Sequence, residues 1–159
     1  MAIIILRIKK LIYTIPREIK IHPAFYRMKE LMQEGYVGSR VLHVEASWFT
    51  ERRADPNLAF GWRDQKEVVG FGAMGDVGVH LVDLVRWLAG DFKRICSQQA
   101  LFTKERVLAD SSGKREVTVE DCAIFIGELT GGGLASFVAN AAARGSAAAP
   151  LAAVATRTT

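Results

Sequence analysis

The most regular run of apolar positions in the chain starts near Val77 and continues at helical spacing to Gly90. This spacing predicts a helix, and glycine is a common residue just past a helix end. Apolar positions cover nearly the whole circumference, which is typical of a buried helix. Successive residues of a helix are rotated by about 100°. With this rotation, three polar residues and a tryptophan lie on one narrow stripe of the helix surface: Asp76, His80, Asp83 and Trp87. The helix therefore carries two acids and a histidine into a largely buried place, where each needs a partner or a role.

Shorter patterns on either side predict one more helix and four strands. The helix is expected after Pro23, which suits a first helical turn, and it should end at Gly35. Alternating apolar and polar positions predict strands over 40–50, 92–103, 120–129 and 134–139. The last two strands should form a hairpin through the glycines at 131–133, with 134–139 left as an edge of the sheet.

Three segments lack such patterns. Residues 51–69 and 104–119 are polar and are expected to form loops. After Asn140 the chain is alanine-rich, with no periodic apolar positions and no acidic residue. We therefore expect an alanine-rich, disordered tail over 141–159.

The stripe of acids and histidine has more than one interpretation. Asp76 and His80 stand four residues apart, as a satisfied pair on one helix face would, and aspartate is also a favoured helix N-cap. A metal site would need three ligands from consecutive turns of one helix, which is an uncommon zinc arrangement, so no metal is predicted. The spacing alone favours the structural pair and leaves proton chemistry as the alternative.

Composition narrows the class of protein. The 159 residues are 50% apolar and 24% charged, as expected for one globular domain. The net charge of +4 comes without a basic block interleaved with aromatic residues, so no nucleic-acid partner is predicted. Cys96 and Cys122 fall in different strands without ligand spacing, which favours free thiols and a cytoplasmic protein. The apolar run at 2–6 is too short to span a membrane, so no membrane partner is expected.

The glycine-rich stretch resembles a known family. Residues 70–80 are GFGAMGDVGVH, followed by LVDL at 81–84 and WLAG at 87–90. This stretch is similar to the start of the catalytic helix in the C-terminal domain of the Gfo/Idh/MocA family of NAD(P)-dependent oxidoreductases. Weaker matches are the GYVG turn at 35–38, the Trp62-Arg63 pair and the VEDCA run at 119–123. The chain departs from the pattern at Phe71, where a further glycine is frequent.

The resemblance implies an α+β fold, with a mostly antiparallel sheet and helices on one face. It covers residues 22–140 as an incomplete C-terminal domain of a two-domain dehydrogenase. Residues 1–21 contain no GxGxxG, no acid spaced to hold a ribose and no Glu-Lys-Pro segment with the family's lysine. We therefore expect 1–21 to be a linker or a divergent remnant rather than a dinucleotide fold.

The resemblance also implies roles for single residues. His80 would move a proton to or from the substrate hydroxyl or carbonyl, and Asp76 would orient His80 or contact the substrate. Arg63, Trp62 and Asp83 are the further candidates for substrate contacts. The implied cofactor is NAD or NADP, which is not expected to bind this chain alone. The implied substrate is a sugar, a polyol or a related hydroxy or keto compound.

Two other functions stay open at this point. The family's open sheet face commonly forms dimers or tetramers, so the chain could be a non-catalytic binding or self-association module, and a homo-oligomer is expected. The tail also fits a non-functional gene fragment. An encoded dinucleotide fold beside this sequence would separate the enzyme from both alternatives.

Overall fold

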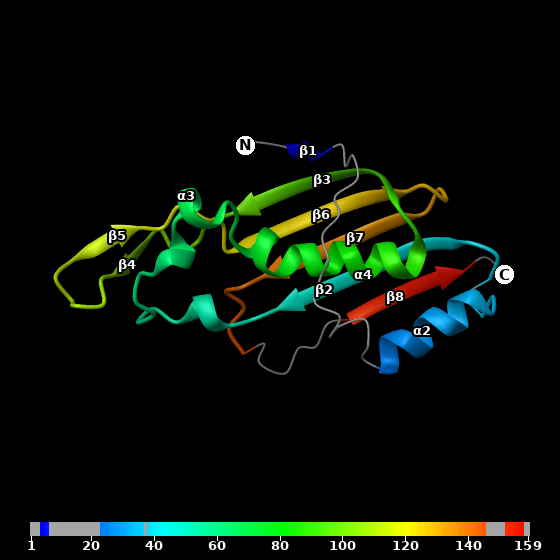
Figure 1. Cartoon of the computed structure of the whole chain (residues 1–159), viewed down its shortest axis with the longest axis horizontal. Helices are drawn as coiled ribbons and strands as arrows, with labels where there is room; N and C mark the ends of the chain where they lie inside the picture. The colour runs from blue at the N-terminus through cyan, green and yellow to red at the C-terminus, as the bar shows by residue number, and fades with distance from the viewer. Residues whose placement is uncertain (1–3, 7–22, 37, 146–151, 158–159) are drawn as a thin grey trace.

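The computed structural model describes residues 4–6, 23–36, 38–145 and 152–157. A six-stranded sheet in the order β1-β3-β6-β7-β2-β8 forms its body, and helix α4 lies across one face of it (Figure 1). The strands are β1 (Ile4–Leu6), β2 (Val41–Phe49), β3 (Phe92–Ala100), β6 (Cys122–Leu129), β7 (Leu134–Asn140) and β8 (Ala152–Arg157). The helices are α2 (Pro23–Gln33), α3 (Lys66–Val69) and α4 (Val79–Ala89). The α+β class expected from the sequence is confirmed.

All strand pairs in the sheet are antiparallel except β2 with β7, which run parallel. The hairpin of β6 and β7 closes through Gly132, whose φ of 84° suits glycine. The prediction that 134–139 forms a sheet edge is wrong, because β7 lies between β6 and β2. The local pattern could show the hairpin, but it could not show the long-range pairing that covers the outer side of β7.

Two predicted irregular segments contain strands. Within 104–119, β4 (Glu105–Val107) and β5 (Lys114–Glu116) form a small antiparallel ladder. Within 141–159, β8 pairs antiparallel with β2 and so differs from the expected disordered tail. Both were hard to see in the sequence: every residue of β5 is exposed, and the β8 sequence AAVATR shows little apolar alternation. Apart from β1, residues 1–21 lie outside the described residues, so the expectation for that segment stays a prediction.

The core lies between α4 and one face of the sheet. Alternate positions of β6 and β7 place Phe125 and Phe137 there, with ring centroids 4.6 Å apart. From the other side α4 contributes four buried side chains: Leu81, Leu84, Val85 and Leu88. The buried helix predicted from its apolar circumference is therefore confirmed.

The opposite face of the sheet is not covered by any described helix (Figure 1). Ile124 and Ile126 alternate with buried residues of β6, and their side chains are 53% and 63% exposed. Leu134, which pairs with Glu128 at the end of the same face, is 59% exposed. Ile124, Ile126 and Leu134 define this open face of the sheet.

One helical stretch in the described chain, Lys66–Ala89, is long and apolar enough to cross a membrane by length and composition alone. A buried core helix can meet the same criteria of length and composition. Here α4 places its apolar side chains against the sheet, which accounts for their hydropathy without a membrane.

Candidate functional site

The glycine-rich run places the start of the α4 helix against the segment before β6. Helix α3 ends at Gly70, whose φ of 78° only glycine adopts without strain. At Gly72 a Cβ atom would overlap the backbone carbonyl oxygen of Glu120. A glycine is therefore required at 72 for the two backbones to pass this closely.

Glu120 binds the first turn of this helix at two points. Its backbone carbonyl accepts a hydrogen bond from the Ala73 N–H at 2.9 Å, and its carboxylate Oε1 accepts one from the Met74 N–H at 3.0 Å. These amides are among the four at a helix start that have no partner inside the helix. The cap thus comes from a residue 46 positions along the chain, and sequence reasoning missed it.

The helix does not begin as a regular α-helix. Residues Met74–Gly78 form a π segment, which joins α4 directly. Such segments occur frequently at functional sites. Asp76 lies inside the π segment with an exposed side chain, and its N–H donates to the Gly72 carbonyl at 2.9 Å. Asp76 is therefore not the helix N-cap, which removes one of the structural interpretations of this residue.

His80 follows in the first turn of α4 and is half-buried. Its ring lies against Trp48 of β2, with centroids 5.5 Å apart and planes at 43°. Nδ1 is buried and has no hydrogen-bond partner among the described residues. A buried polar atom without a partner costs about 1–3 kcal/mol, so it calls for an explanation such as a role in chemistry.

The residues of the polar stripe have different surroundings. Among the described residues, no hydrogen bond or ion pair joins Asp76 to His80, so the satisfied helix pair is not what the structure contains. Asp83 is half-buried one turn further along. Trp87 packs against α2, where Tyr26 and Lys29 approach its ring at 6.4 and 5.9 Å. The stripe therefore divides into an open end at Asp76 and a packed end at Trp87.

Trp62 and Arg63 lie in the short 3₁₀ turn Trp62–Asp64 before α3. Both are exposed, and the Arg63 guanidinium stacks 5.0 Å from the centre of the Trp62 ring. No hydrogen bond or ion pair in the described part of the chain ties either residue to Asp76 or His80. Their role as substrate contacts, like that of Asp83, stays a prediction.

Close to Glu120 lies a buried ion cluster that the sequence did not reveal. Arg53 Nε donates to Asp121 Oδ1 at 2.7 Å, and Arg53 Nη1 lies 3.1 Å from Asp64 Oδ1. Arg106 Nε is 3.5 Å from the same Asp64 oxygen, while Arg106 Nη2 donates to the Arg53 carbonyl at 2.7 Å. Neither guanidinium contact to Asp64 Oδ1 has hydrogen-bond alignment, so both act as ion pairs. The cluster ties the loop after β2 and the β4–β5 ladder to the start of β6.

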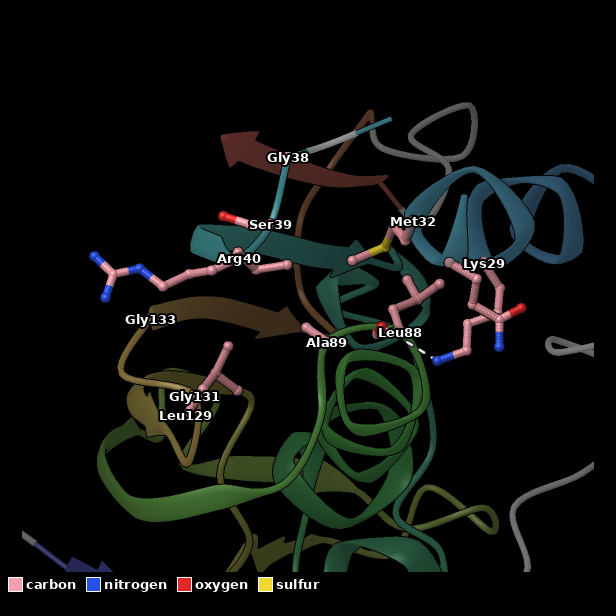
Figure 2. Close-up of a pocket in the computed structure, with 12 residues that line it drawn as sticks. Lys29, Met32, Gly38, Ser39, Arg40, Leu88, Ala89, Leu129, Gly131 and Gly133 are labelled. Atoms are coloured by element: carbon pink, nitrogen blue, oxygen red, sulfur yellow. Dashed lines mark hydrogen bonds between the residues drawn. The ribbon is translucent and has the colours of Figure 1, made fainter. Parts of the chain in front are cut away.

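A cavity of about 340 Å³ lies at the other end of α4, beside Leu88 and Ala89. Leu88 is eight residues beyond His80, or about 12 Å along the helix. Lys29 donates to the Trp87 carbonyl at 2.6 Å, so its charge caps the helix end. Figure 2 shows the Arg40 side chain extending away from Leu88 and Ala89. The two cationic residues that line this cavity therefore do not converge on one point, and we place the candidate site at His80.

The first amides of the His80 helix are not free to bind a phosphate. A phosphate loop uses free N–H groups at a helix start, but here Glu120 already binds those of Ala73 and Met74. The Glu120 carboxylate would also repel a phosphate at this position. No group of three or more metal-ligating side chains occurs in the part of the chain that the structure describes.

These features define an α+β domain of the kind that two-domain oxidoreductases carry. Residues 25–158 match the family model of the GFO/IDH/MocA C-terminal domain. The chain therefore belongs to this family. The match extends beyond residue 140, where the sequence resemblance had ended, and takes in β8.

Known relatives support the same assignment. Levoglucosan dehydrogenase of Pseudarthrobacter phenanthrenivorans is 31% identical over 100 residues, which are 63% of this chain and 25% of that protein. The structure of levoglucosan dehydrogenase in complex with NADH and L-sorbose is similar, with a TM-score of 0.70 at 29% identity, over 76% of this chain and 34% of the other. The structure of an oxidoreductase domain protein from Kribbella flavida is also similar, with a TM-score of 0.77 at 30% identity. The match covers 86% of this chain and 37% of the other. The matched part of this chain thus spans between 25% and 37% of these proteins.

Proposed function

We propose that this chain supplies the substrate-binding and proton-transferring half of an NAD(P)-dependent oxidoreductase. The complete reaction would interconvert a hydroxyl and a carbonyl on a sugar, a polyol or a related compound, with hydride passing to or from the nicotinamide. The observation that carries the proposal is the buried, unpartnered Nδ1 of His80. It lies at the start of the helix that matches the family's catalytic helix.

The proposed part for His80 is that of a general base or acid. In the oxidative direction its imidazole would accept the proton of the substrate hydroxyl as the carbonyl forms, and it would return the proton in the reductive direction. Such proton transfer contributes about 10²–10⁴-fold to a rate. Trp48 restricts the ring from one side, which limits the directions from which a hydroxyl can approach. Asp76, exposed at the open end of the stripe, is proposed to contact the substrate.

The proposal gives this chain no part in holding the cofactor phosphates. The helix-start amides are used by Glu120, and titration of NADH into the chain alone should show no tight binding. NAD or NADP would be held by a dinucleotide domain that lies outside the described residues or comes from another chain. Complexes of relatives with NADH and with a sugar are what suggest the cofactor and substrate class.

The experiment is reconstitution with a separately expressed dinucleotide domain from a full-length relative. NADH formation is followed with levoglucosan as substrate, for the original chain and for His80→Ala. The matched control is His43→Ala, since His43 lies on the open face and bonds to Ser136 Oγ at 3.1 Å. We expect the His80 variant to lose about 10²-fold or more and the His43 variant to keep its rate. Equal rates for both variants would contradict the proposal.

A second candidate function is self-association of the chain through its open sheet face. Ile124, Ile126 and Leu134 expose an apolar surface there, and apolar patches of this kind mark protein contacts. We propose a second copy of the chain as the partner. Ile126→Glu should then shift sedimentation toward monomer, while Val68→Glu, an exposed apolar residue in α3, should not. A monomer at high micromolar concentration before any substitution would refute it.

We also propose that the protein works in the cytoplasm. Cys96 and Cys122 are both free thiols, as expected in a reducing compartment. A labelled chain secreted with an oxidised cysteine would speak against this location.

A further inference from the structure

Glu120 lies two residues before β6, yet it makes the contacts that define where the His80 helix begins. Its carbonyl and its carboxylate bind consecutive amides, those of Ala73 and Met74. The Gly72 backbone packs so closely on the Glu120 carbonyl that no side chain would fit at 72. These three contacts fix both the position and the direction of the helix start.

The segment that Glu120 binds is the one with the irregular geometry. Met74 is the first residue of the π segment, which ends at Gly78, two residues before His80. A π turn contains one residue more per hydrogen-bonded ring than an α turn, so it sets how far the following helix is rotated. If the Met74 amide lost its partner, the segment could relax toward an α-turn and rotate Asp76 relative to His80.

Glu120 is itself held from the other side. Its neighbour Asp121 is fully buried and accepts hydrogen bonds from Arg53 Nε, at 2.7 Å, and from the amides of Phe102 and Thr103, at 2.8 and 2.9 Å. The Asp121 N–H donates to the Ala100 carbonyl at 2.9 Å. Glu120 therefore sits on a rigid support, as a residue that positions another group must.

We propose that Glu120 is a positioning residue for the proton-transfer site: through the Met74 amide it holds the π segment, and thereby sets the orientation of Asp76 and of the His80 ring. The inference rests on the proposed function of His80. Glu120 does not touch the imidazole in the described contacts, so its effect passes through the backbone.

Three substitutions separate the capping contact from general packing. Glu120→Gln keeps an acceptor oxygen at the same reach. Glu120→Asp keeps the charge but is one methylene too short for the Met74 amide. Glu120→Ala removes both. Glu116→Ala is the matched control, because Glu116 is exposed on β5 and four residues away.

The measurements are amide hydrogen exchange at Ala73 and Met74 and the ¹⁵N signals of the His80 imidazole, in the full chain. We expect Glu120→Asp to speed exchange of the Met74 amide about tenfold or more and to move the His80 signals. Glu120→Gln should leave both close to those of the original protein. Because neither readout requires enzymatic activity, this result is independent of whether the chain is a dehydrogenase.

The reconstituted assay adds the link to chemistry. Glu120→Asp should lower kcat by about 10²-fold, the effect of a small misplacement, with KM much less changed. His80 signals that stay unmoved in Glu120→Asp would overturn the inference, as would equal changes in the Asp and Gln variants. Changes no greater than those of Glu116→Ala would also overturn it. If Glu120→Ala fails to fold, the comparison of Glu120→Asp with Glu120→Gln still tests whether the capping contact positions His80.

Discussion

The buried carboxylate of Asp121 offers the sharpest test of what holds the site end of the molecule together. It is fully buried and accepts from the Arg53 guanidinium and from the amides of Phe102 and Thr103. Asp121→Ala would remove all three acceptor contacts at once. It would also leave Arg53, which is only 12% exposed, with Asp64 as its remaining ion-pair partner.

The size of the loss follows from these contacts. Removing one partner of a buried ion pair costs about 3–5 kcal/mol, because the remaining charge stays buried. A typical domain has a free energy of unfolding of about 5–15 kcal/mol, so the variant should be severely destabilised. For a chain of this length each kcal/mol lowers Tm by about 2–4 °C, which predicts a fall of about 6–20 °C.

The assay is urea unfolding of the original chain and Asp121→Ala, with Glu116→Ala as the exposed control. Combining Asp121→Ala with Arg53→Met should cost less than the sum of the two, because in the double variant no buried Arg53 guanidinium has lost its Asp121 partner. Coupling of contacting charges is of order 0.5–3 kcal/mol in such cycles. A loss below about 1 kcal/mol for Asp121→Ala, or strict additivity in the cycle, would refute the reasoning.

Two other predictions concern the same part of the molecule. Gly72→Ala should destabilise by roughly 1–3 kcal/mol in urea unfolding, since its Cβ would overlap the Glu120 carbonyl, whereas Gly131→Ala meets open space and should be nearly neutral. Iodoacetamide should modify Cys96 before Cys122 in the native protein, because burial, and secondarily the Asp121 charge, raises the pKa of the buried Cys122 thiol. Equal unfolding free energies for the two glycine variants would contradict the close approach of Gly72 to Glu120. Equal rates of modification of the two cysteines, measured by mass spectrometry, would contradict the burial of Cys122.

The sequence was informative where a local pattern determines the structure. Helix α4 is apolar around most of its surface, and the structure buries Leu81, Leu84 and Val85 as that pattern requires. The hairpin of β6 and β7 was predictable because the glycines at 131–133 lie between two alternating segments. The Gly-Asp-x-Gly-x-His run was specific enough to identify the family that the C-terminal-domain match later gave.

The rest depends on contacts between distant segments. Arg106 looks like a surface residue of a polar segment, yet its side chain is fully buried because Asp64 and the carbonyls of Arg53 and Asp55 surround it. The π segment is stabilised by a carboxylate 46 residues away, which no local pattern at Met74 could indicate. The parallel pairing of β2 with β7 is likewise a long-range choice.

The same distinction applies to the candidate site. The spacing drew attention to His80 and Asp76, and the resemblance implied their roles, but the helical wheel assumed a continuous α-helix. The structure shows Asp76 exposed in a π segment, with no hydrogen bond to His80 among the described residues, and it places the His80 ring against Trp48. Glu120 carried no signal beyond its place in the VEDCA run.

The central claim, that His80 meets the substrate, is tested most directly by the ¹⁵N signals of the histidine rings during a sugar titration. The chain is labelled at histidine, mixed with the dinucleotide domain of a relative and NADH, and titrated with L-sorbose. His43, on the open face with Ser136, is the internal control. The account predicts a saturable change at the His80 ring and none at His43. A His80 ring that stays unmoved at sugar concentrations that saturate turnover would contradict it.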